Sequence, residues 1–475
     1  MTPLIPYPFA RAHQLLVTRV GDGIEVRASR SSTLTGIAEI RRVLGMVKLR
    51  MEDEDALREA ISKAYSASEG SAQSVVDQVA DDVDIARLME DTPAVEDLLE
   101  SADDAPIIRL INALLTQAVR EGASDVHIEA FEDSSVVRLR IDGTLRDIAR
   151  PKRALHAALI SRIKIMALLD IAEKRLPQDG RITLRVAGRP IDVRVSTLPT
   201  GFGERAVLRL LDKSNDKLDL NALGMAADTL AQFDALIKQP HGIVLVTGPT
   251  GSGKTTTLYA GMKRMDASTT NIMTVEDPIE YELRGVGQTQ VNAKIDLTFA
   301  TALRAILRQD PDVIMIGEIR DLETAQIAVQ ASLTGHLVLA TLHTNDAPSA
   351  VTRLADMGIE PFLLSSSLLG VLGQRLVRKL CPHCRKLEVV EGRTVFRAVG
   401  CTECGNSGYS GRSGVYELLV VDENIQKLIH ENAGEAAIRD VAMAKGMRTM
   451  RMDGERYIGN GTTSPEEIIR VTRDA

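Results

Sequence analysis

The feature that most constrains the fold is a glycine-rich loop between an apolar strand and a helix. Residues 243–246 read Ile-Val-Leu-Val, which predicts a buried parallel strand, and residues 255–265 predict a helix. The loop at 248–255 matches the phosphate-binding pattern G-x-x-x-x-G-K-[ST]. Its glycines allow backbone N–H groups to turn toward phosphate oxygens, and the helix start adds partial positive charge. The chain is therefore predicted to bind a nucleoside triphosphate.

The polar residues of this loop have individual predicted roles. Lys254 reaches the β- and γ-phosphates, and the Thr255 hydroxyl binds Mg²⁺. The alternative is a chance glycine-rich turn, which the agreement of strand, loop and helix disfavours. The predicted nucleotide-binding residues are Gly248, Pro249, Thr250, Gly251, Ser252, Gly253, Lys254, Thr255 and Thr256.

A second signature is the apolar strand predicted at 313–316, which Gly317 and Glu318 follow. The carboxyl ends of strands in open α/β sheets are where ligands bind, so Glu318 should lie beside the phosphate loop. It is predicted to activate the attacking water or to hold the Mg²⁺ shell. Gly317 stands where a Walker-B aspartate is usual, which shifts these duties onto glutamates. An ordinary surface glutamate is the alternative.

An acidic box follows the strand predicted at 271–275. Glu276, Asp277 and Glu280 place three carboxylates within five residues, which is costly without a nearby cation. Glu276 and Asp277 are predicted to orient water and Mg²⁺, whereas Glu280 has a weaker claim. A capped acidic turn is the alternative.

Histidines and arginines complete the candidate set. His336 and His343 bracket the strand predicted at 337–341, and His343, at the carboxyl end, is favoured as the nucleotide-linked histidine. Arg194 and Arg209 lie on predicted strands of the preceding domain. An arginine within an apolar strand needs an anion or a carboxylate partner. These arginines are predicted either to reach the nucleotide from outside the core domain or to form structural ion pairs.

All four cysteines fall within 24 residues, at Cys381, Cys384, Cys401 and Cys404. The spacing C-x₂-C-x₁₆-C-x₂-C is typical of a closed, structural Zn²⁺ site with four thiolates. Four reduced thiols without metal are the alternative. Basic residues cluster between 375 and 397, where they are predicted either to face a partner or anionic headgroups or to form a solvated surface.

Composition excludes several classes of protein. No run of the 475 residues approaches the ~18 apolar residues of a membrane span, and the N-terminus lacks the pattern of a signal peptide. We therefore expect a cytosolic protein that reaches a membrane through partners. A net charge of -8, no Trp and 3% aromatic residues argue against nucleic acid as a partner.

The chain divides into segments of different character. Residues 125–129, 136–141, 182–186 and 191–195 predict short strands, with turns at 142–143 and 187–188. Asp and Glu dominate 66–104, which predicts an acidic linker. The predicted parts are an N-terminal partner-docking domain (1–65), the linker (66–104), an α+β domain (105–218), an α/β ATPase domain (219–374), a tetracysteine module (375–415) and a C-terminal helical segment (416–475).

With these motifs in order, the chain resembles the secretion ATPases of bacteria, and within them the GspE family of type II secretion ATPases. The resemblance covers nearly the whole chain. The type IV pilus assembly ATPases share these motifs and stay open as an alternative, and a DNA-transfer ATPase of related fold is a more distant one. The specific motifs are at 122–129, 175–181, 248–255, 274–281, 317–321, 334–346 and 381–404.

The resemblance implies more than the residues do by themselves. It implies a RecA-like ATPase domain after a PAS-like α+β domain, a homo-hexameric ring, and ATP hydrolysis that powers pseudopilus assembly in type II protein secretion. By motif position, Arg194 and Arg209 match the family's arginines that reach the nucleotide. It also implies an N-terminal domain that docks on the cytoplasmic domain of the inner-membrane L protein, and contact with the F protein.

Overall fold

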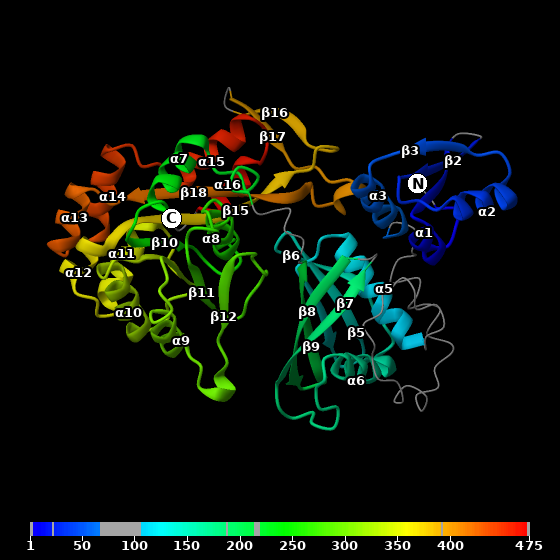
Figure 1. Cartoon of the computed structure of the whole chain (residues 1–475), viewed down its shortest axis with the longest axis horizontal. Helices are drawn as coiled ribbons and strands as arrows, with labels where there is room; N and C mark the ends of the chain where they lie inside the picture. Colours follow the sequence, from blue (N-terminus) through cyan, green and yellow to red (C-terminus); the bar gives the residue numbers. More distant parts are fainter. Residues whose placement is uncertain are drawn as a thin grey trace. The chain divides into compact units, whose positions relative to one another are not determined.

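The computed structural model describes residues 3–20, 23–66, 106–186, 189–212, 219–390 and 393–472, in two compact units, Met1–Lys213 and Ser214–Ala475 (Figure 1). The acidic linker predicted at 66–104 lies outside the described residues except for Ser66, and so does the turn predicted at 187–188. None of the helices described combines the length and the hydrophobicity that crossing a bilayer requires.

The first unit begins with a small α/β domain. Its three-stranded sheet has the order β1-β2-β3, and its apolar side chains form two small clusters of their own, around Leu16 and around Val17. Helix α3 begins with two acidic residues, Glu54 and Asp55, in its first turn, where negative charge stabilises a helix. The elements are α1 (Tyr7–His13), β1 (Leu15–Val20), β2 (Gly23–Ala28), α2 (Leu34–Leu44), β3 (Lys48–Met51) and α3 (Glu54–Ser66).

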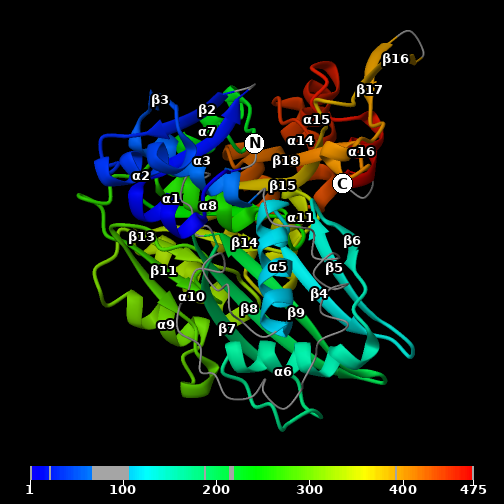
Figure 2. The same cartoon turned by 90° about the vertical axis from the view of Figure 1, so that its right-hand side faces the viewer.

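The rest of the first unit is an antiparallel six-stranded sheet of order β6-β5-β4-β9-β8-β7. Strand alternation turns one apolar face toward α5 and α6, which cover it in Figure 2. The turn predicted at Asp142-Gly143 joins β5 to β6. The elements are α5 (Pro106–Arg120), β4 (Asp125–Ala130), β5 (Ser135–Ile141), β6 (Thr144–Ala149), α6 (His156–Met166), β7 (Gln178–Val186), β8 (Arg189–Thr200) and β9 (Gly203–Asp212).

The second unit is built on a seven-stranded sheet of order β12-β11-β13-β14-β10-β15-β18. All neighbours pair in parallel except β15 and β18. The central strands are buried on both faces, which explains their continuous apolar runs. The strands are β10 (Gly242–Thr247), β11 (Ile272–Glu276), β12 (Val286–Gln290), β13 (Val313–Ile316), β14 (Leu337–Leu342), β15 (Leu368–Leu380) and β18 (Tyr409–Val420).

Helices cover both faces of this sheet and close the chain. One apolar cluster gathers α9 to α14 on one face, and another gathers α7 and α8 on the other. The helices are α7 (Ala227–Leu236), α8 (Lys254–Met262), α9 (Phe299–Ile306), α10 (Leu322–Leu333), α11 (Ala347–Asp356), α12 (Pro361–Ser367), α13 (Glu423–His430), α14 (Glu435–Ala444), α15 (Met450–Gly459) and α16 (Pro465–Val471).

The cysteine module is an insertion between β15 and β18. These two long strands run side by side out of the sheet, and the β16 (Lys386–Val390)–β17 (Arg393–Arg397) hairpin lies between them in sequence (Figure 1). The boundaries proposed at 374 and 415 therefore fall inside β15 and β18. The same two strands belong both to the seven-stranded sheet and to the stem of the module.

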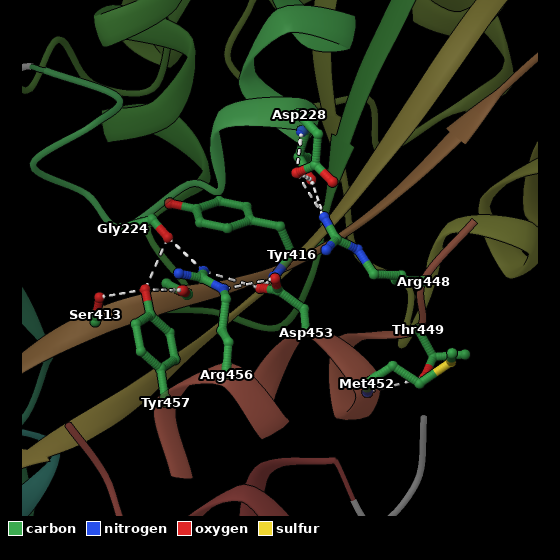
Figure 3. Close-up of polar contacts among 12 residues, drawn as sticks. Gly224, Asp228, Ser413, Tyr416, Arg448, Thr449, Met452, Asp453, Arg456 and Tyr457 are labelled. Carbon is green, nitrogen blue, oxygen red and sulfur yellow. Dashed lines mark hydrogen bonds and ion pairs between the residues drawn. The ribbon is translucent and has the colours of Figure 1, made fainter. Parts of the chain in front are cut away.

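A polar network holds α15 against the segment that precedes α7 (Figure 3). The Tyr457 hydroxyl donates to the Gly224 carbonyl at 2.7 Å and lies 2.8 Å from the Ser413 hydroxyl. Asp453 accepts from the backbone N–H of Tyr416 at 3.0 Å and from Arg456 at 2.8 Å. The C-terminal helices are thus fastened to β18 and to the start of the second unit.

Candidate active site

The phosphate loop follows β10 directly and ends where α8 begins. Gly248, Gly251 and Gly253 have φ of 150°, 78° and 88°, in the region that residues with a Cβ avoid. A Cβ on Gly248 would lie 2.3 Å from the Gln374 carbonyl oxygen, whereas a Cβ on Gly251 would meet no atom within 4 Å. Backbone geometry and crowding thus account for the glycines, and the loop leads into a helix N-terminus suited to an anion.

Lys254 is folded back against its own loop. Its Nζ donates to the carbonyls of Gly248 at 2.8 Å and Pro249 at 3.0 Å, and the residue is buried. Burial lowers the pKa of Lys254 to about 8, against the opposing charge of Glu318. A cation held this close to the loop is placed to pair with phosphate oxygens.

Four neighbouring parallel strands bring the candidate residues to one edge of the sheet. The order β11-β13-β14-β10 places the ends of the acidic box, the Glu318 segment, the His343 segment and the phosphate loop side by side. Because parallel strands share their carboxyl edge, this juxtaposition follows from the topology. The predicted strands at 243–246, 271–275, 313–316 and 337–341 are all confirmed within one residue at each end.

Glu318 is the centre of a charged cluster. Arg320 contacts its carboxylate and also approaches Asp277 at 3.6 Å. His343 Nε2 lies 3.5 Å from the other Glu318 oxygen. The Glu318 side chain is only 17% exposed, so two cationic or potentially cationic groups face a carboxylate that is largely shielded from water.

The two histidines have different surroundings. Burial lowers the pKa of His343, the positive charge of Lys254 lowers it further, and Glu318 opposes both effects. His336 precedes the amino end of β14, where its Nδ1 lies 2.8 Å from the Ala331 carbonyl oxygen. The structure therefore brings His343, and not His336, to the edge that carries Lys254 and Glu318.

Glu276 lies at the same edge but is turned into a buried polar cluster. Its carboxylate accepts hydrogen bonds from the hydroxyls of Tyr259 and Thr274, and from Gln288 Nε2 at 3.1 Å. Only 2% of the residue is exposed, and burial raises the pKa of Glu276. A direct role in hydrolysis would require this carboxylate to leave its hydrogen bonds, and it stays a prediction.

The two arginines lie opposite one another on the neighbouring strands β8 and β9 of the six-stranded sheet. Arg194 pairs in register with Arg209, and Arg209 pairs with Asp125 on β4. Arg209 Nε lies 2.9 Å from the Asp125 carboxylate, yet 55% of the Arg209 side chain is exposed. The ion-pair alternative therefore describes Arg209 within its own unit, and delivery of either arginine to a nucleotide stays a prediction.

The four cysteines come together as the spacing predicted. The ligand atoms of Cys381, Cys384, Cys401 and Cys404 lie within 4.8 Å of one another, and three of the Sγ pairs are 3.7 to 3.9 Å apart. A tetrahedral site with Zn–S bonds of about 2.3 Å has sulfur–sulfur edges of about 3.8 Å. Three backbone N–H groups also donate to these sulfurs, which suits thiolates.

Much of the basic cluster near this module is paired within the chain. Arg378 forms an ion pair with Glu467 at 2.7 Å, and Arg385 donates to the Gly461 carbonyl at 2.7 Å. Arg397 lies 2.7 Å from Glu388. Because Arg378, Arg385 and Arg397 are paired within the chain, fewer of the basic side chains are available to bind a partner or anionic headgroups.

Two residues of the site were not singled out from the sequence. Arg320 lies in the motif at 317–321, and its signal in the sequence is an arginine two residues after a strand-end glutamate. Gln374 lies at a predicted domain boundary, and its signal is a polar side chain that directly follows the apolar run 368–373.

Fold and site together define a phosphate-loop nucleoside triphosphatase with an α/β fold built on a mixed sheet. The model of the family described as "Type II/IV secretion system protein" matches residues 100–470. Type II secretion system protein HxcR of Pseudomonas aeruginosa is 63% identical over 99% of this chain and 100% of that protein. Type II secretion system ATPase E of Vibrio cholerae is 53% identical, over 99% and 97%. The chain belongs to the type II secretion ATPases, the GspE family, and it is an ATP hydrolase of type II protein secretion.

Two solved structures share the fold. The pilus retraction motor PilT with bound ADP is 29% identical, with a TM-score of 0.54 over 76% of this chain and 96% of PilT. The ATPase DotB of Legionella pneumophila shares the fold at a TM-score of 0.60 and 23% identity, over 82% of this chain and 99% of DotB. The predicted family is thus confirmed, and the α/β secretion ATPase fold with it.

Proposed function

We propose that ATP is hydrolysed at the carboxyl edge of the seven-stranded sheet, with Glu318 as the base that activates water. The observation that carries this proposal is that Lys254, Glu318 and His343 follow three neighbouring parallel strands and meet at their carboxyl ends. Lys254 would pair with the phosphates, and Arg320 would hold the Glu318 carboxylate in place until a nucleotide binds. His343 would then sense the γ-phosphate from beside Glu318.

The donor set also fits Mg²⁺, the usual companion of ATP. The carboxylates of Asp277 and Glu318 both approach the guanidinium of Arg320, so two oxygen donors lie near the same positive charge. The hydroxyl of Thr255, the second residue of α8, would be a further oxygen donor. Mg²⁺ neutralises charge on the β- and γ-phosphates when it is bound.

The tetracysteine cluster fits Zn²⁺ by the same test. Four sulfurs at tetrahedral spacing, with backbone donors aimed at them, suit a structural site without an open position. We propose that Zn²⁺ holds the base of the β16–β17 hairpin and so completes the stem formed by β15 and β18.

The biological setting is the finer part of the proposal. The chain would act in the cytoplasm as a homo-hexamer that powers pseudopilus assembly, held at the inner membrane through the L protein and in contact with the F protein. Residues 1–65 would provide the docking domain, because their apolar clusters are self-contained. The six-stranded sheet of the first unit with its helices would be the PAS-like domain, and Arg194 and Arg209 would reach the nucleotide when the ring closes.

Glu318→Gln tests the assignment of the base. The amide keeps the shape of the side chain but cannot accept a proton, so ATP binding should persist while kcat falls by about 10²–10⁴-fold. Glu323→Gln is a matched control, because Glu323 is 58% exposed on α10 and paired with Arg304. Turnover by Glu318→Gln at the wild-type rate would refute the role of Glu318.

A further inference from the structure

A glutamine from a different strand lies directly beneath the phosphate loop. Gln374 is on β15, one residue beyond the point where β15 pairs with the end of β10. It is 2% exposed. Its side-chain oxygen accepts a hydrogen bond of 2.8 Å from the hydroxyl of Thr257, which is fully buried on the first turn of α8.

The same glutamine touches both ends of the loop. A Cβ on Gly248, the first loop residue, would lie 2.3 Å from the Gln374 carbonyl oxygen. A Cβ on Gly253, the last residue before α8, would lie 2.9 Å from Gln374 Nε2. Gln374 therefore sets how closely the loop packs against β15 at Gly248 and at Gly253. Through Thr257 it also contacts helix α8, which follows the loop.

We infer that Gln374 is a positioning residue for the phosphate loop. The loop binds phosphate through backbone N–H groups, whose directions depend on the spacing between β10 and α8. Holding that spacing before the nucleotide arrives reduces the ordering cost of binding. The inference rests on the phosphate loop as the nucleotide site, and it adds a residue that acts on the nucleotide only through the loop.

Gln374 also lies on the strand that leads to the cysteine module. Cys381, the first cysteine of the module, lies seven residues after Gln374 and directly follows the end of β15. The strand that carries the loop's support is thus the strand on which the module is built. Gln374 connects the cysteine module to the nucleotide site through the covalent chain rather than through a flexible linker.

ADP affinity of the full-length protein tests the inference. Gln374→Leu keeps similar volume without the acceptor, and Thr257→Val removes the donor. Each should weaken ADP binding by about 10-fold, because the free energy that this buried bond supplies for ordering the loop would then have to come from nucleotide binding. The double variant should be no weaker than either single variant, because both remove the same bond. Thr257→Ser keeps the hydroxyl and should restore affinity.

Two controls keep the outcomes distinct. Ser413→Ala removes a buried hydroxyl on the neighbouring strand β18 and should lower thermal stability without changing ADP affinity. Lys254→Ala should weaken ADP binding if the loop is the nucleotide site. Loss of affinity in Lys254→Ala with unchanged affinity in Gln374→Leu overturns the role of Gln374 alone. Unchanged affinity in Lys254→Ala overturns the site itself, and additive losses in the double variant overturn the shared bond.

Discussion

The sharpest stability prediction concerns Glu467, which fastens α16 to β15. Its carboxylate accepts the Arg378 backbone N–H at 3.0 Å, two bonds from the Arg378 guanidinium and two from Arg470. The side chain is fully buried. Burial alone raises the pKa of Glu467, but the hydrogen bonds from Arg470 and Arg378 outweigh burial and bring it to about 2.

The lowered pKa sets the size of the effect. A fall from the ordinary value of 4.5 to about 2 corresponds to about 3 kcal/mol of stabilisation at neutral pH. The folded-state pKa is below the unfolded one, so this contribution is complete above about pH 4.5 and declines as the pH falls toward 2. Glu467→Gln should therefore destabilise the docking of α16 by about 3 kcal/mol at pH 7, which is roughly a 100-fold change in the opening equilibrium.

Amide hydrogen exchange of the full-length protein is the suitable assay. Peptides that cover 465–471 should exchange roughly 100-fold faster in Glu467→Gln at pH 7. Glu466→Gln is the matched control, because this neighbouring carboxylate is 57% exposed and lies 3.8 Å from Arg397. Exchange in Glu467→Gln within about threefold of wild type would refute the reasoning. The difference in opening free energy between Glu467→Gln and the wild type should also shrink near about pH 3, to less than half its value at pH 7.

Three further predictions concern the metal, the arginines and the N-terminal domain. Freshly prepared, reduced protein should contain about one Zn²⁺ per chain by elemental analysis, and Cys404→Ser should loosen the module while sparing nucleotide binding; absence of zinc would reject the site. Arg209→Ala should lower kcat more than nucleotide affinity if this arginine acts on the γ-phosphate; Arg209→Lys, which keeps the charge and the approach to Asp125, is the control, and an unchanged kcat in Arg209→Ala would leave only the ion pair. Deleting residues 1–65 should preserve basal ATPase activity and release the protein from inner membranes that carry its partner; undiminished co-sedimentation would place the recruiting surface elsewhere.

Local sequence was sufficient to predict a structural feature wherever the pattern and its physical cause lie within one short segment. The phosphate loop could be read because glycine spacing, an apolar strand and a helix start are contiguous. The cysteine cluster could be read because two C-x₂-C pairs are chemically specific and use every cysteine of the chain. The strands leading to Glu318 and His343 were equally clear, because strands buried on both faces are continuously apolar.

The sequence predicted which residues carry the chemistry, and the tertiary structure decided what each of them touches. The strand order β11-β13-β14-β10 differs from the order along the chain, so only the folded sheet places Arg320 between Glu318 and Asp277. Glu276 belongs to the same motif as Asp277 but is buried under Tyr259 and Gln288. The bond between Thr257 and Gln374 joins residues 117 positions apart. Contacts of this kind arise from long-range packing, which no local periodicity encodes.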